Sequence, residues 1–283
     1  MIRPAVVVAL CSFGVIEGAV RPNILFAISD DQSWMHASAY GDKGTRTPAF
    51  DRVAGEGVLF THAFASCPSC MPSRTSILTG MNMWETGPGG NLMGTLKADY
   101  AIFSLMLEQS GYQLGATGKT WGPGRLEGFD PKGGKSLPSR SYSSAQTEAI
   151  LGRSFHERKL KKARKGMNNL DYAANFADFL AVRDQEKPFF FWYGSTEPHQ
   201  GYEVGAWKAA GKRLEEALVP GCLPDDPVIR GEFLDYGLEI EHFDQHLARM
   251  LEMLRKECLL ENTLIVVTSD HGNPMPRSKC NLY

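Results

Sequence analysis

Three segments of the chain share one pattern, in which a nearly continuous apolar run is followed at once by polar or charged residues. They are "NILFAISDD" at 23–31, "KPFFFWYGSTEPH" at 187–199 and "NTLIVVTSDHG" at 262–272. Such runs are typical of strands buried on both faces of a parallel sheet. The pattern therefore predicts three buried strands, each with polar residues at its C-terminal end.

The segments between these strands carry apolar residues at helical spacing, at 99–111, 168–184 and 228–257. Strands that alternate with helices predict an α/β fold of three layers with a largely parallel central sheet. Ligands bind at the carboxyl ends of the strands in such sheets, so the acid-bearing strand ends should converge on one site. Segments 86–94 and 122–138, rich in glycine and proline, are expected to form long loops over that edge.

Acidic residues stand at two of the predicted strand ends: Asp30 and Asp31 at the first, Asp270 with His271 at the last. Carboxylates gathered in one place repel one another unless a cation holds them, and a hard divalent ion is the natural partner for oxygen ligands. Asp also caps helices and turns, which would explain any one of these residues alone. Their matching positions favour a shared metal site.

The overall composition favours a globular protein and gives little indication of a partner. With 283 residues, 43% of them hydrophobic, the chain can bury a large core. A formal net charge of −2 gives no overall attraction to nucleic acid or membrane, and we expect no nucleic-acid partner. The basic run "RSFHERKLKKARKG" at 153–166 is the strongest patch of charge. It could hold a polyanionic glycan, but a solvated helix face is the favoured interpretation.

The first residues have the composition of an export signal. Arg3 is followed by an apolar stretch that is too short to span a bilayer comfortably. We interpret residues 1–19 as a signal peptide, with a buried first strand as the alternative, and residues 20–283 as the domain that carries the predicted metal site. The mature chain is then expected to have no membrane span and to be secreted or periplasmic, or lysosomal in a eukaryote.

The segment "CPSCMPSRTSILTG" at 67–80 carries the most specific motif. It resembles the signature of the type I sulfatases, Cys-x-Pro-x-Arg followed by an apolar pair and Thr-Gly, in which the cysteine is oxidised after translation to formylglycine. The residues that match at the family's spacing are Cys70, Pro72, Arg74, Leu78, Thr79 and Gly80.

Four further segments are similar to other parts of this family. "RPNILFAISDDQ" resembles its metal-binding first strand, "TGKTWGPG" its lysine loop, "STEPHQGY" its histidine loop and "TSDHGNPMPRSKCNLY" its last metal-binding strand. The last of these is most similar to the N-sulfoglucosamine sulfohydrolases and their bacterial relatives. The resemblance implies that residues 20–283 are a sulfatase catalytic domain with an alkaline-phosphatase-like α/β/α sandwich.

The resemblance also implies an activity, the hydrolysis of sulfate esters or N-sulfate groups of a sulfated saccharide. A serine that attacked sulfur would become a stable sulfate ester. A hydrated aldehyde avoids this, since one hydroxyl attacks sulfur and loss of the proton from the other expels sulfate. A formylglycine-generating or anaerobic sulfatase-maturating enzyme would be needed as a partner to oxidise Cys70.

Site residues follow from the same resemblance. The implied metal is Ca²⁺, and its implied ligands are Asp30, Asp31, Cys70 as formylglycine, Asp270 and His271. The implied catalytic residues are Cys70, Arg74, Lys119, His199 and Lys279. Arg74 would reach back to the nucleophile and the carboxylates, the two lysines would balance charge on the sulfate oxygens, and His199 is the candidate general acid for the leaving group.

Two positions depart from the family's pattern. Many relatives have a histidine two places after the loop lysine, where it can take the proton that triggers sulfate release, and this chain has Trp121 there. Either another base serves or turnover is slow. His271 stands where many relatives have asparagine, and imidazole is a less usual calcium ligand than an oxygen group. The alternative is that His271 does not bind the metal itself and instead contacts the residues that do.

Two other functions stay open at this point. One is a phosphatase or phosphonate hydrolase of the same superfamily, and the other is a catalytically silent protein that binds sulfated glycans, as Trp121 and the basic run suggest.

Family members usually continue through further strands and a smaller C-terminal subdomain. We therefore expect a chain that stops at Tyr283 to lack the C-terminal part of the fold.

Overall fold

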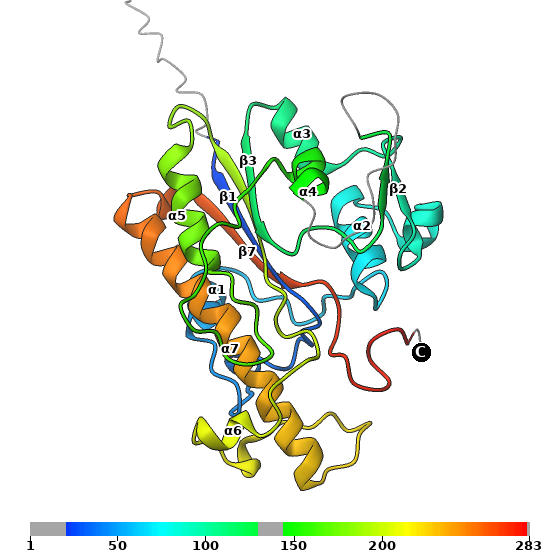
Figure 1. Ribbon diagram of the computed structural model, residues 1–283, viewed down its shortest axis with the longest axis vertical. Coiled ribbons are helices and arrows are strands. Elements are labelled where there is room, and N and C mark those ends of the chain that lie inside the picture. Colours follow the sequence, from blue (N-terminus) through cyan, green and yellow to red (C-terminus); the bar gives the residue numbers. More distant parts are fainter. Residues whose placement is uncertain (1–20, 130–143, 282–283) are drawn as a thin grey trace, which may run out of the picture.

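A computed structural model describes residues 21–129 and 144–281. The predicted signal segment 1–19 lies outside the described residues, as does the part of the predicted loop from residue 130 onward. Within them, the main sheet has five parallel strands in the order β5-β3-β6-β1-β7 (Figure 1). These strands are β1 (Asn23–Ser29), β3 (Gln113–Gly118), β5 (Arg153–Ser154), β6 (Phe189–Gly194) and β7 (Thr263–Ser269).

The three apolar runs form β1, β6 and β7, as the sequence pattern predicts. Strand β6 is buried along its whole length, whereas β7 lies at one edge of the described sheet and is mostly half-buried. Strand β1 lies between them, with Ile24 opposite Phe190 on one side and opposite Leu264 on the other. The acid-bearing ends of β1 and β7 therefore lie next to each other.

Helices cover both faces of the sheet (Figure 1). On one face lie α1 (Pro48–Glu56), α5 (Tyr172–Val182) and α7 (Pro227–Lys256). On the other lie α2 (Cys70–Thr79), α3 (Phe103–Gln109) and α4 (Ser144–Leu151). The helices predicted at 99–111, 168–184 and 228–257 are thus confirmed as α3, α5 and α7, and so are the three layers.

Alternation along β6 connects the two halves of the core. Phe189, Phe191 and Tyr193 belong to the cluster beneath α5 and α7, whereas Phe190 and Trp192 belong to the cluster beneath α2, α3 and α4. Successive side chains of a strand point to opposite faces, so one run of five aromatic residues supplies both layers. Burial of each such side chain contributes about 1.5–3 kcal/mol.

The smaller elements lie outside the main sheet. Strands β2 (Thr95–Lys97) and β4 (Arg125–Glu127) pair in parallel, so the predicted loop at 122–138 contains a strand that sequence reasoning did not predict. The short helices are α6 (Ala206–Ala209), η1 (Ser38–Tyr40), η2 (Met83–Glu85), η3 (Gly87–Gly90), η4 (Leu214–Glu216) and η5 (Leu260–Asn262). Among the described helices, none is both long and apolar enough to cross a membrane.

The basic run at 153–166 does not form a helix, so the prediction of a solvated helix face is wrong. Its first two residues are β5, and the rest is irregular chain. The backbone instead pairs with a later segment, because Lys159 forms an antiparallel bridge with Leu170 and the amide of Asp171 donates to the carbonyl of Arg158 over 3.0 Å. These backbone hydrogen bonds to residues 170 and 171 take the place of those that a helix would make.

Candidate active site

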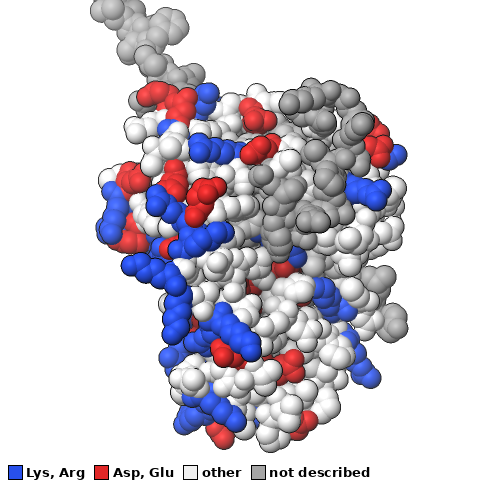
Figure 2. All heavy atoms as spheres, viewed as in Figure 1, with Lys and Arg blue, Asp and Glu red and all other residues white. Residues whose placement is uncertain are grey.

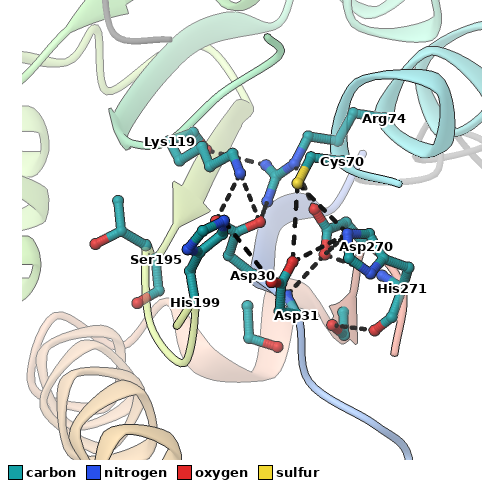
Figure 3. Close-up of polar contacts among 12 residues, drawn as sticks. Asp30, Asp31, Cys70, Arg74, Lys119, Ser195, His199, Asp270 and His271 are labelled. Carbon is teal, nitrogen blue, oxygen red and sulfur yellow. Dashed lines mark hydrogen bonds and ion pairs between the residues drawn. The ribbon is translucent and has the colours of Figure 1, made fainter. Parts of the chain in front are cut away.

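The predicted site residues converge at the carboxyl edge of the sheet (Figure 3). Asp30 and Asp31 follow β1, Lys119 follows β3, and Asp270 with His271 follows β7. His199 lies on the loop after β6, and Cys70 is the first residue of α2. The structure therefore brings together side chains from both ends of the sequence.

Five of these residues form a buried cluster: Asp30, Asp31, Cys70, Asp270 and His271. One ligand atom from each lies within 4.8 Å of all the others. Asp31 adopts the left-handed backbone region, with φ of 69°, and its amide donates to Oδ1 of Asp270 over 3.0 Å. Non-glycine residues rarely occupy this region, and such strain is concentrated at functional sites.

The thiol of Cys70 points into this cluster. Its Sγ lies 3.4 Å from Nε2 of His271 and 3.8 Å from Oδ1 of Asp31, and the residue is only 4% exposed. As the first residue of α2, Cys70 lies at the positive end of the helix dipole. This position favours an anion beside the thiol.

Arg74 lies one helical turn after Cys70 and is completely buried. Its Nε donates to Oδ2 of Asp270 over 3.0 Å, and Nη2 lies 3.5 Å from Oδ1 of Asp30. Nη1 donates to the carbonyls of Lys119 and Thr120 over 3.2 and 2.7 Å. The guanidinium thus joins the acids after β1 and β7 to the loop after β3.

Two lysines contact different carboxylates of the cluster. Nζ of Lys119 lies 2.5 and 2.6 Å from the two carboxylate oxygens of Asp30. Nζ of Lys279 lies 2.7 and 3.0 Å from those of Asp31, and 3.1 Å from Nε2 of His199. His199 itself is the most exposed of the catalytic candidates, with 45% of its side chain accessible. Partial burial and the charges of the two lysines lower its pKa, against the effect of Asp31.

The three carboxylates differ in their affinity for protons. Burial, with the negative charge of Asp270, raises the pKa of Asp30 to about 7. Burial also opposes ionisation of Asp270, but Arg74 and His271 outweigh it and hold the pKa of that carboxyl far below its usual range. Burial likewise opposes ionisation of Asp31, and hydrogen bonding to His271 nevertheless lowers its pKa.

This set of donors fits a divalent cation. Three buried carboxylates with oxygens within 4.8 Å of one another are costly without a compensating charge, and their oxygens are the ligands that Ca²⁺ prefers. An imidazole nitrogen and the side chain of residue 70 complete the cluster. The residues that would hold the ion are Asp30, Asp31, residue 70, Asp270 and His271.

The sequence analysis did not predict Glu197, whose hydrogen bonds support the site without reaching the cluster. Glu197 is buried, accepts hydrogen bonds from Ser195, Tyr172 and the amide of Asn168, and its carbonyl accepts from the amide of Asp30 over 3.0 Å. It therefore ties the histidine loop to the end of β1. Its place two residues before His199 was the signal that could have identified it.

Trp121 lies in the core instead of contacting the cluster. It is 2% exposed, packs with Met71 and Leu126 beneath α2, and its Nε1 donates to Oγ1 of Thr75 over 2.9 Å. At the position where many relatives have a histidine, this chain therefore has a side chain that packs in the core.

Comparison with known proteins decides the family. A family model described as Sulfatase matches residues 22–282. The chain belongs to the sulfatase family. The resemblance seen around Cys70 is confirmed at this level. Among curated sulfatases, the human N-sulphoglucosamine sulphohydrolase is 27% identical and the match covers 97% of this chain and 56% of that protein.

Further members support the assignment. The N-acetylglucosamine-6-O-sulfatase of Bacteroides thetaiotaomicron is 32% identical, over 89% of this chain and 45% of that protein. The crystal structure of the sulfatase yidJ from Bacteroides fragilis matches with a TM-score of 0.67 at 23% identity, over 92% of this chain and 64% of that one. The alkaline-phosphatase-like fold is thereby confirmed. The chain spans about half the length of the curated sulfatases it matches.

Proposed function

We propose that this protein is a sulfatase that removes sulfate from a sulfated saccharide, as an ester or as an N-sulfate, through formylglycine made from Cys70. The observation that carries the proposal is the position of Cys70. Its side chain lies at the N-terminus of α2, within 3.8 Å of Asp31 and 3.4 Å of His271, in a buried cluster of carboxylates. A nucleophile there adjoins both an anion-binding helix terminus and a candidate Ca²⁺ site.

Two groups would supply chemistry that the unmodified chain lacks. A Ca²⁺ held by Asp30, Asp31, residue 70, Asp270 and His271 would polarise sulfate and favour an ionised nucleophile. Formylglycine made from Cys70 would, as its hydrate, supply one hydroxyl to attack sulfur and a second whose deprotonation would expel sulfate and leave the aldehyde, which water would hydrate again.

The chain's own residues position the substrate and move its protons. Lys119 and Lys279, which reach the cluster at Asp30 and Asp31, would balance charge that develops on the sulfate oxygens. His199 is accessible to solvent beside Lys279, where it would donate a proton to the leaving oxygen or nitrogen. Because its pKa is lowered, the protonated form needed for this step is favoured by acidic pH.

Saccharide substrates are proposed from the relatives. Two curated proteins that match along most of this chain are named for sulfated amino sugars, N-sulphoglucosamine in one and N-acetylglucosamine 6-O-sulfate in the other. We place the substrate in the same class. Export and maturation of Cys70 by a formylglycine-generating or anaerobic maturating enzyme belong to the same proposal.

The decisive experiment co-produces the full chain with and without a formylglycine-generating enzyme. With it, the peptide that contains residue 70 should carry an aldehyde in place of the thiol, and the protein should release sulfate from N- or 6-O-sulfated glucosamine. Without it, the protein should fold and be nearly inert. Cys70→Ala should be inactive in both preparations, and Cys67→Ala, which changes a second buried cysteine three residues earlier, serves as the matched control.

Three outcomes would contradict the proposal. Equal turnover by unmodified Cys70 protein would remove the need for an aldehyde. Faster hydrolysis of aryl phosphate than of aryl sulfate would indicate a phosphatase. Binding of sulfated saccharide without any release of sulfate, after confirmed oxidation of Cys70, would indicate a silent binding protein.

A further inference from the structure

The basic loop, defined here as residues 158–170, carries a group of unpaired positive charges. Five exposed cations occupy seven positions near its tip: Lys159, Lys161, Lys162, Arg164 and Lys165. Within the described parts of the chain, none of their side chains makes a hydrogen bond or an ion pair. At the base of the loop, by contrast, Arg158 contacts both carboxylate oxygens of Asp178. The four lysines are therefore available to an external anion, whereas Arg164 also interacts electrostatically with the buried acids Asp235 and Glu239 of α7.

The backbone that bears these charges is well anchored. The bridge between Lys159 and Leu170 closes the loop, and the amide of Leu160 donates to the carbonyl of Asn169 over 2.7 Å. Asn175 on α5 exchanges two hydrogen bonds with the backbone of Arg158. A loop that is already ordered loses less conformational entropy when a ligand binds to it.

The same loop is attached to the candidate active site. The amide of Asn168 donates to Oε1 of Glu197 over 2.7 Å. Glu197 stands two residues before His199. Gly166 packs so closely against the next part of the histidine loop that a Cβ there would lie 2.5 Å from the carbonyl oxygen of Gly201. The loop that bears the cations is thus packed against the histidine loop, which carries His199, the most exposed of the catalytic candidates.

Arg164 lines two surface hollows. One, of about 170 Å³, lies between the loop and α7 and is also lined by Lys162 and His242. The other, of about 250 Å³, includes Glu203. The acid in the first hollow, Glu241, is paired with Lys212 at 2.5 Å, so the cations there are not neutralised by it. Figure 2 shows Lys and Arg side chains gathered where the loop crosses α7.

We propose that the basic loop is a subsite that binds sulfate groups of an extended substrate chain, away from the sulfate group that is cleaved. This rests on the proposed function. Sulfated saccharides are polyanions, and the planar guanidinium of Arg164 can contact two sulfate oxygens at once, while the lysines act as point charges. Contacts of this kind are individually weak and reinforce one another along one chain. Affinity should therefore rise with saccharide length and fall with salt.

The test measures binding without turnover, in full-length Cys70→Ala protein. The probes are a heparin-derived decasaccharide and a disaccharide of the same sulfation, titrated at 0.05 and 0.2 M salt. The triple variant Lys161→Gln, Lys162→Gln, Lys165→Gln should weaken decasaccharide binding at least tenfold at low salt and reduce its salt dependence. Disaccharide affinity should change less than twofold. Arg164→Gln should weaken the decasaccharide further, and Arg164→Lys should restore only part of the loss.

A matched control removes the same charge elsewhere. Lys187 lies just before β6, and Arg255 and Lys256 end α7, so all three lie toward the edge of the sheet opposite the site. They are exposed and make only surface ion pairs, with Asp184 and Glu252. Changing all three to Gln should leave decasaccharide affinity within twofold of the parent. Equal losses in both triples, or none in the loop triple, would overturn the proposal. It would also fail if a single-stranded oligonucleotide of equal charge bound as tightly through the loop.

This experiment separates the two proposals. Because Cys70→Ala protein is used, the binding result can be interpreted whether or not the mature enzyme releases sulfate. A protein with no sulfatase activity would contradict the proposed function and leave the measured length dependence intact.

Discussion

Nε2 of His271 lies 3.0 Å from Oδ1 of Asp31, although the two residues stand near opposite ends of the described chain. Burial disfavours the charged imidazole, but the hydrogen bonds to Asp31 and Cys70 outweigh it and raise the pKa of His271 to about 10. The ring is therefore protonated at neutral pH. A cation that binds through Nε2 has to displace that proton.

Calcium affinity should accordingly depend on pH. Between pH 7.5 and 9, above the pKa of Asp30 and below that of His271, release of one proton should raise the affinity about tenfold per pH unit. His271→Asn supplies an oxygen ligand without a proton, so its calcium affinity should be tighter at pH 7.5 and nearly independent of pH. Calorimetric titration of both proteins at pH 7.5 and 9 measures this. Parallel pH dependences would argue against direct ligation by His271.

Arg74→Lys should be strongly destabilising despite its unchanged charge. The guanidinium makes hydrogen bonds to Asp270 and to the carbonyls of Lys119 and Thr120. A lysine cannot reproduce this planar arrangement, and buried acceptors without a donor are costly. We expect a loss of roughly 3–5 kcal/mol in urea unfolding. Arg158→Lys, which alters an exposed ion pair, should cost less than about 1 kcal/mol. Similar losses in the two variants would show that burial of Arg74 contributes little.

Trp121→Phe separates the structural role of this residue from a catalytic one. Phenylalanine keeps most of the apolar volume and loses the hydrogen bond to Thr75, which should lower the free energy of unfolding by about 1–2 kcal/mol. Sulfate release per folded, aldehyde-bearing molecule should stay near the parent value. A large loss of turnover at unchanged stability would instead place the indole in the reaction.

Glu239 should make the stability of the protein depend on pH. Burial, with the charge of Glu197, raises its pKa to about 8, against 4.5 for an ordinary glutamic acid. Between these values the folded protein holds a proton that the unfolded chain has lost, so stability falls as pH rises through this window, and the cost is fully present above pH 8. Glu239→Gln should flatten this slope and stabilise the protein at pH 9 by roughly 2–5 kcal/mol.

Urea unfolding at pH 5, 7 and 9, in the presence of a chelator, would measure the effect of Glu239→Gln. Glu56→Gln is the control, because that side chain is 66% exposed. A wild-type slope retained in Glu239→Gln would assign the pH dependence to another group.

Sequence reasoning succeeded where a pattern reports directly on burial. The runs that form β1 and β6 are apolar because both faces of these strands are covered, whereas the equally apolar run of β7 is mostly half-buried at the edge of the described sheet. Strand β3 was missed because Gln113–Gly118 contains two glycines, and its burial depends on its neighbours. At Gly115 a Cβ would lie 2.6 Å from Phe179, a constraint that no local pattern contains.

The site followed the same division. A motif that spans one helical turn predicts Cys70 and Arg74, and positions at strand ends predict the acids; the fold brings these side chains together. Glu197 was missed because its partners, Tyr172 and Asn168, are brought to it only by the folded chain. The charge of the basic run favours a solvated helix face, whereas its conformation is decided by the bridge between Lys159 and Leu170.

The central place of β1 has a consequence for biosynthesis. Its two neighbours in the sheet begin at Phe189 and Thr263, so they leave the ribosome long after β1 does. At about 5–20 residues per second, the wait is roughly ten to fifty seconds. Throughout that time an apolar strand with at least one open edge needs protection from aggregation, and a chaperone that holds the nascent chain extended would supply it. The same interval leaves the segment around Cys70 exposed, before Asp270 and His271 have been synthesised.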